Sequence, residues 1–169
     1  MRPFLLLGIT FLMTPTSLWA DDGSGTISGT IGETQVNVSI WTEQSDFYGD
    51  GNSGGVSIMT RPVARDDGLG ALAIGFEGSD FAKGALTSFE ISIGDVAAES
   101  RSEYFADLDQ DLQVVITRGE KRGDSLFLAG TVRGTLIWRQ LMPVSERKED
   151  PSRQLPVELA FDVVVANEL

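Results

Sequence analysis

Hydrophobic and polar residues alternate without a break from Asp124 to Gln140. The even-numbered positions from 126 to 138 are occupied by Leu126, Leu128, Gly130, Val132, Gly134, Leu136 and Trp138. A period of two over that length, rich in β-branched and aromatic residues, predicts one long strand whose even-numbered side chains, Trp138 included, face a core. The two glycines on that face predict a bulge or a bend where another backbone comes close.

Shorter alternating segments occur along the rest of the chain, separated by turn-forming residues at intervals of roughly a dozen residues. They predict strands at 24–32, 35–41, 56–60, 69–76, 89–93, 112–117 and 157–165. We therefore expect an all-β fold, an antiparallel β-sandwich or a jelly-roll-like arrangement, with seven to eight strands.

The segments between these strands carry weaker patterns. Residues 46–55 are dense in turn formers and predict the loop of a hairpin between 35–41 and 56–60. Residues 95–106 predict at most one short helix, capped by Asp95. The longest loop is expected at 142–154, which holds two prolines and several charges.

The first twenty residues have the layout of a secretory signal peptide. Arg2 precedes an apolar run, and Ala20 ends the segment just before two aspartates. We expect residues 1–20 to be removed and residues 21–169 to form a single domain in the bacterial periplasm or outside the cell, without membrane insertion. The chain has no cysteine, so its fold must depend on an apolar core.

Acidic residues dominate the first part of that domain. Loss of Arg2 leaves 12 basic against 25 acidic residues, a formal charge of −13. Residues 21–111 contain 17 acidic and 4 basic residues, whereas residues 112–169 contain 8 of each. Nucleic acid is an unsuitable partner for such a surface, because phosphate binding needs clustered lysine and arginine.

The chemistry open to the protein is narrowed by two missing residue types. The chain has neither histidine nor cysteine. Their absence removes Ser-His-Asp and Cys-His catalysis and the usual zinc, copper and haem sites. Paired carboxylates could still carry a hydrolase or lyase reaction, but no motif singles out two of the acidic residues. The sequence therefore favours a binding protein over an enzyme.

One candidate metal site lies between two predicted strands. Asp107, Asp109 and Asp111 recur at the spacing with which a calcium-binding loop begins, and calcium prefers carboxylate oxygens. The rest of an EF-hand loop is missing, because Leu112 and Arg118 stand where glycine and glutamate are needed. The alternative is an acidic turn before the next strand.

A candidate ligand site comes from two aromatic residues. Trp41 has the opposite parity to Val38 and Ile40 and is expected to be exposed, and Tyr48 follows in the turn-rich segment. An exposed indole or phenol ring can stack on a sugar. The sequence thus predicts an exported domain that acts by binding, with a glycan or calcium as candidate ligands and an unknown protein or carbohydrate as partner. The alternatives are a carboxylate-based hydrolase or lyase, and an assembly protein that pairs through a strand edge.

Overall fold

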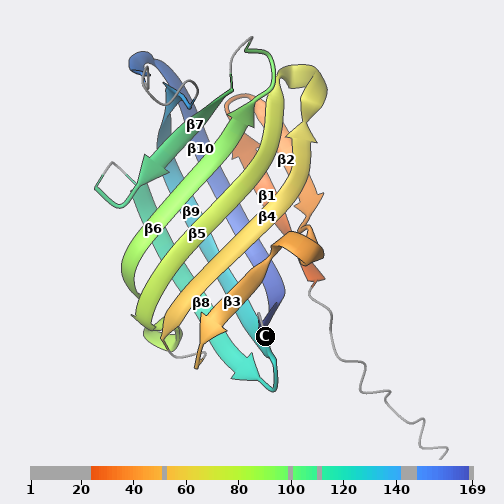
Figure 1. Ribbon diagram of the computed structural model, residues 1–169, viewed down its shortest axis with the longest axis vertical. Coiled ribbons are helices and arrows are strands. Elements are labelled where there is room, and N and C mark those ends of the chain that lie inside the picture. The colour runs from red at the N-terminus through yellow and green to blue at the C-terminus, as the bar shows by residue number, and fades with distance from the viewer. Residues whose placement is uncertain (1–23, 51–52, 99–100, 110–111, 142–147, 168–169) are drawn as a thin grey trace, which may run out of the picture.

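The computed structural model describes residues 24–50, 53–98, 101–109, 112–141 and 148–167, and the predicted signal peptide lies outside these ranges. The described residues form ten strands and three short 3-10 turns (Figure 1). The strands are β1 (Ser24–Ile31), β2 (Thr34–Ser39), β3 (Asp46–Gly49), β4 (Gly54–Ala64), β5 (Leu69–Asp80), β6 (Ala85–Asp95), β7 (Ser102–Asp107), β8 (Leu112–Arg122), β9 (Ser125–Gln140) and β10 (Lys148–Asn167). The turns are η1 (Thr42–Gln44), η2 (Arg65–Asp67) and η3 (Phe81–Lys83).

All ten strands belong to one sheet, in the order β2-β1-β10-β3-β4-β5-β6-β7-β9-β8. The sheet closes on itself because β10 also pairs with β9 over most of its length. The result is a barrel, in which neighbouring strands are antiparallel except for a short parallel contact between β10 and β3 (Figure 1). A bridge between Ile40 and Thr60 ties the end of β2 to β4.

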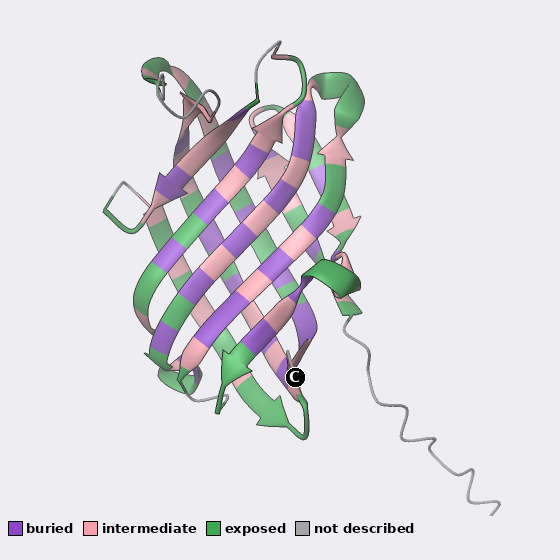
Figure 2. Cartoon of the chain, in the orientation of Figure 1, coloured by how far each residue is buried: buried purple, intermediate pink, exposed green. Residues whose placement is uncertain are grey.

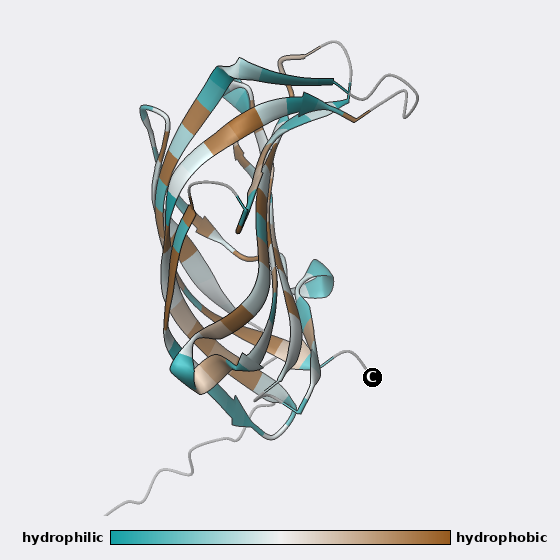
Figure 3. Cartoon of the chain, turned by 90° about the vertical axis from the view of Figure 1, so that its left-hand side faces the viewer, coloured by the Kyte–Doolittle hydropathy of each residue, from teal (hydrophilic) through white to brown (hydrophobic). Residues whose placement is uncertain are grey.

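The alternating pattern of the sequence becomes an inside and an outside of this barrel. Buried residues alternate with more exposed ones along each long strand (Figure 2), and hydrophobic residues follow the same alternation (Figure 3). On β9, the predicted core residues Leu126, Leu128, Val132 and Leu136 are fully buried. The glycine between them, Gly130, lies under the ring of Phe161, where a Cβ atom would be 2.6 Å from Cζ. The backbone carbonyl oxygen of Val115 on β8 would also lie 2.6 Å from that Cβ atom, so the predicted approach of another backbone is confirmed at this glycine.

Aromatic side chains fill the barrel near η3. Phe81, on η3, is fully buried and meets Phe76 edge to face, with ring centroids 5.6 Å apart. Phe76 in turn stacks on Phe89 of β6 at 6.1 Å. Because such pairs add to the stability gained from burial, this turn anchors the connection between β5 and β6.

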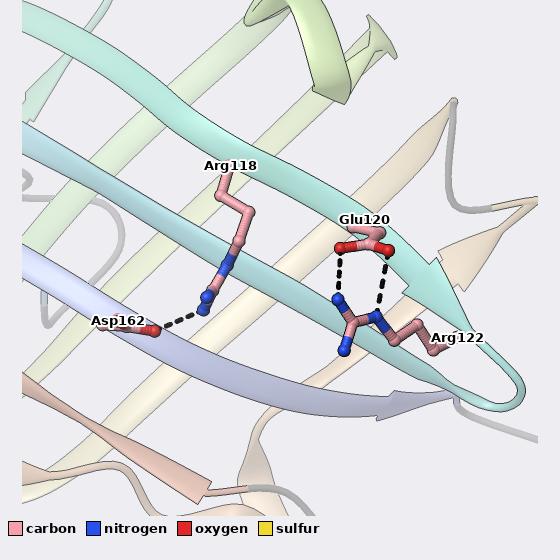
Figure 4. Close-up of polar contacts among 4 residues, drawn as sticks. All are labelled: Arg118, Glu120, Arg122 and Asp162. Atoms are coloured by element: carbon pink, nitrogen blue, oxygen red, sulfur yellow. Dashed lines mark hydrogen bonds and ion pairs between the residues drawn. The ribbon is translucent and has the colours of Figure 1, made fainter.

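The outer face of β8, β9 and β10 carries ion pairs, both between strands and within one strand. Arg118 on β8 reaches over β9 to bond Asp162 on β10 (Figure 4). The two residues stand opposite Ala129 from either side, and the Arg118 guanidinium also lies over the Phe127 ring of β9, 5.9 Å from its centroid. Arg122 binds both carboxylate oxygens of Glu120 in the same region (Figure 4).

The all-β prediction is confirmed, and several details are corrected. The described part of the chain has ten strands rather than seven to eight, in one closed sheet rather than two stacked ones. The expected hairpin of 35–41 with 56–60 is replaced by pairs β1–β2 and β3–β4, because the turn-rich segment contains β3. The described residues of 95–106 contain no helix, and β7 occupies Ser102–Asp107. Strand β10 already begins at Lys148, inside the loop expected at 142–154.

Among the described residues, no helix is both long and apolar enough to cross a membrane.

Candidate functional site

A hollow of about 580 Å³ lies on the outer face of β3, β4, β5, β6 and β7. Its lining combines carboxylates, aromatic rings and very small residues. The carboxylates are those of Asp46, Glu77, Glu90, Asp107 and Asp109, and the outward-facing aromatic side chains are those of Tyr48 and Phe105, whereas the rings of Phe76 and Phe89 are buried inside the barrel. The described residues that line it include no lysine and no arginine. We call this site the outer hollow.

Strand register explains how the outer hollow is built. Residues that pair from strand to strand form a row across the sheet, and one such row consists of Asp46, Ser57, Gly75, Glu90 and Asp107. Neighbouring strands lie about 4.8 Å apart, so the row spans roughly 19 Å between its terminal aspartates. Serine and glycine in its centre leave a trough, with the acidic residues at either end.

Tyr48 forms one wall of the outer hollow. Its ring lies over Gly55, where a Cβ atom would be 2.3 Å from Cε1, and its hydroxyl donates a hydrogen bond of 2.8 Å to Glu77 Oε1. This hydrogen bond to the carboxylate raises the pKa of Tyr48 above its ordinary value of 10.0. The phenol is 53% exposed, so the bond fixes the ring while leaving part of it open to a ligand.

Phe105 lines the opposite side of the outer hollow. The guanidinium of Arg139 stacks on its ring, 3.5 Å from the centroid, and bonds Glu103 through Nε at 2.7 Å. The Arg139 charge is therefore already paired with a carboxylate. This pair fixes the Phe105 ring without making the hollow basic.

The electrostatics of the outer hollow favour cations. Glu90 and Asp107 stand directly opposite each other on β6 and β7, and like charges in that position destabilise a sheet. Glu90 also lies over Gly75, where a Cβ atom would be 3.1 Å from Oε1. A positively charged group bound in the trough would offset this repulsion.

The predicted calcium residues fall partly within this site. Asp107 and Asp109 both line the outer hollow, and the backbone N–H of Asp109 donates to Asp107 Oδ1 at 3.1 Å. Asp111 lies outside the described residues. Within the ranges that the structure describes, no three acidic side chains gather closely enough to hold a metal ion. The calcium site stays a prediction.

The structure does not bring Trp41 to Tyr48. Trp41 lines a smaller hollow of about 340 Å³, together with the end of β2, η1 and two residues of β4. The ring is half-buried rather than freely exposed, because Arg61 stacks on it at 4.4 Å from the centroid. Of the two predicted ligand-binding residues, only Tyr48 belongs to the outer hollow.

Trp138, predicted to lie in the core, is half-buried at the end of the barrel where β6 and β9 finish. Its indole Nε1 donates a hydrogen bond of 2.9 Å to Asp95 Oδ2, and Arg153 of β10 donates to the same oxygen at 2.9 Å. The inward-facing parity of β9 thus continues to Trp138, but the partner there is a carboxylate rather than an apolar side chain.

Several residues of the outer hollow could not be found from the sequence. The alternation of the sequence indicates that certain residues face outward, among them Glu77, Glu90 and Phe105. It does not indicate which outward residues become neighbours in the sheet. That depends on strand pairing over long sequence separations.

No protein-family model, curated protein or solved structure matches this chain.

Proposed function

We propose that this chain is an exported binding domain that holds a positively charged ligand or protein segment in the outer hollow. The row from Asp46 to Asp107 is the observation that carries the proposal, because it puts carboxylates at both ends of a trough floored by serine and glycine. The half-exposed ring of Tyr48 adds a surface on which a cation or a flat ligand can rest.

Length and charge also support this function. Four residues of an extended chain cover roughly 13 Å at 3.3 Å each, and long lysine side chains at the two ends extend this reach. Tetralysine is therefore a suitable probe, since its ammonium groups can reach both acidic ends of a trough of about 19 Å. An amino sugar or another small cation would occupy only part of the trough.

Calorimetric titration with tetralysine tests the proposal. We expect binding that weakens steeply with salt, because exposed charges are screened beyond about 10 Å at 0.1 M. A double variant, Glu90→Gln with Asp107→Asn, should reduce the affinity at least about tenfold, a loss of 1.4 kcal/mol. The matched control is Glu120→Gln with Asp162→Asn, which removes the same charge from the face of β8 and β10.

Equal losses in the two double variants would show that net charge alone attracts the peptide, and would overturn the proposal. Absence of binding to the unaltered protein at low salt would do the same.

A carboxylate-based hydrolase is a second candidate, because Glu90 and Asp107 are directly paired on neighbouring strands. Cβ atoms of such pairs lie about 5 Å apart. The carboxyl groups lie one and two carbons further out, so rotation of these side chains can bring them to the separation of about 5 Å that retaining glycosidases use. Turnover of a glycoside by the unaltered protein, lost in a folded Glu90→Gln variant, would establish this role.

A further inference from the structure

Four side chains from four strands meet inside the barrel at the end where β6 and β9 finish and β7 and β10 begin, the upper end in Figure 1. They are Asp95, Tyr104, Trp138 and Arg153. This group, which we call the mouth cluster, shares no residue with the outer hollow.

The guanidinium of Arg153 occupies the centre of the mouth cluster. It lies 4.3 Å from the centroid of the Trp138 ring and 5.8 Å from that of Tyr104. Its Nη2 donates to Asp95 Oδ2 at 2.9 Å and lies 3.4 Å from the Tyr104 hydroxyl oxygen. Two aromatic rings and a carboxylate around one cation are the arrangement with which proteins recognise cationic groups.

Asp95, which binds the guanidinium, is buried and held by further hydrogen bonds, whereas Arg153 itself lies in an irregular part of β10. The Asp95 side chain is only 6% exposed, and it also accepts from the Ala97 N–H and the Trp138 indole. Arg153 is 41% exposed and lies in an irregularity of β10, where the pairing with β9 jumps from Asp150 to Gln154. Such bulges re-aim a side chain, and this one points Arg153 back over Trp138.

We infer that Asp95, Trp138 and Tyr104 form a binding site for a guanidinium group, and that Arg153 is its internal occupant, which an external guanidinium ligand must displace. Outward movement of Arg153 leaves the Trp138 face and Asp95 Oδ2 without their cation. Asp95 would keep its bonds from the Ala97 N–H and the Trp138 indole, but a buried carboxylate without an opposite charge is costly, so the site needs a cation of the same shape. A guanidinium satisfies it better than an ammonium, because a planar cation can stack on the indole while it bonds the carboxylate.

Removal of the internal occupant tests this inference. We expect Arg153→Ala to bind methylguanidinium, with quenching of Trp138 fluorescence and a rise in melting temperature, and to bind methylammonium at least tenfold more weakly. The unaltered protein should bind methylguanidinium at least tenfold more weakly than Arg153→Ala. Adding Asp95→Asn to Arg153→Ala should abolish the effect. The matched control is Arg61→Ala, which uncovers Trp41 and should gain no binding.

Three results would overturn the inference: no binding by Arg153→Ala, equal binding by the unaltered protein, or equal binding after Asp95→Asn. If Arg153→Ala requires a bound cation in order to fold, folding that is restored by methylguanidinium but not by methylammonium supports the site. Failure of both cations to restore folding overturns the inference. None of these variants alters the outer hollow, so the outcome is independent of the tetralysine titration.

Discussion

Tyr48 and Glu77 stand on β3 and β5, two strands apart, and their side chains join across Gly55 of the intervening strand. Arg118 and Asp162 join in the same way across Ala129 on the other side of the barrel. In both places a very small residue in the middle strand lets a long side chain lie flat on the sheet. These crossings shape the outer surface, and the first of them builds a wall of the outer hollow.

Gly55→Ala should displace the Tyr48 ring, because the new methyl group would lie 2.3 Å from its Cε1 atom. The expected loss is about 1 kcal/mol in the free energy of unfolding, the usual contribution of one hydrogen bond. Urea unfolding measures it. Gly94→Ala is the matched control, since a Cβ atom there has no neighbour nearer than 3.6 Å. If Gly55→Ala lowered the free energy of unfolding by the same amount in a protein that already carries Tyr48→Ala, displacement of the Tyr48 ring would not be the cause of the loss.

The pH dependence of Tyr48 follows from the same hydrogen bond. Glu77 raises the pKa of the phenol in the folded protein, so the bond stabilises the fold below pH 10 and this stability is lost as the pH rises through the raised pKa. Tyrosine ionisation can be followed by absorbance as the pH is raised. The difference between the curves of the unaltered protein and Tyr48→Phe gives the ionisation of Tyr48. Glu77→Gln should move its pKa back toward the ordinary value. Unchanged titration in Glu77→Gln would show that the carboxylate is not the cause.

Two ion pairs on the outer surface should contribute differently to stability. The Glu103–Arg139 side chains are 15% and 21% exposed, whereas those of Asp162 and Arg118 are 69% and 41% exposed. Double-mutant cycles should give a coupling of at least about 1 kcal/mol for the first pair, in which the charges are less solvated. The exposed pair should give about 0.5 kcal/mol or less, reduced further by salt. A larger coupling for Arg118–Asp162 would contradict the burial argument.

Asp95 should be among the most sensitive polar residues for stability. Asp95→Ala removes the acceptor for both Trp138 and Arg153 and leaves a partly buried guanidinium without its carboxylate, for which we expect a loss of about 3 kcal/mol. Asp95→Asn keeps an oxygen for the Trp138 indole and should lose less. Thermal unfolding followed by tryptophan fluorescence measures both changes. Equal stability of the two variants would show that the indole bond contributes nothing.

The sequence predicts the strands far better than it predicts their neighbours. Alternation located β9 and its buried face, because every second residue of a strand points to the same side. The same alternation failed at Ser102–Asp107, where Tyr104 and Ala106 are the inward residues and the apolar pattern is too short to be recognised. It also failed at Asp46–Gly49, where turn-forming residues surround a strand of four residues.

The candidate site was predicted in part for a similar reason. Tyr48, Asp107 and Asp109 were selected by residue type and do line the outer hollow. Glu77 and Glu90 are ordinary outward residues in the sequence, and they acquire their importance from the pairing of β5 with β6. No local pattern encodes which strands pair, so the row that joins Asp46 to Asp107 becomes visible only in the folded barrel.

Amide chemical shifts recorded during a tetralysine titration show where on the barrel the peptide binds. We expect the first and largest shifts at Ser57, Gly75, Glu90 and Asp107, with little change at Glu158 and Asp162 on the opposite outer face. Shifts of similar size at all exposed acidic residues would contradict the proposal, because the peptide would then be attracted by the overall negative charge and not held by the outer hollow.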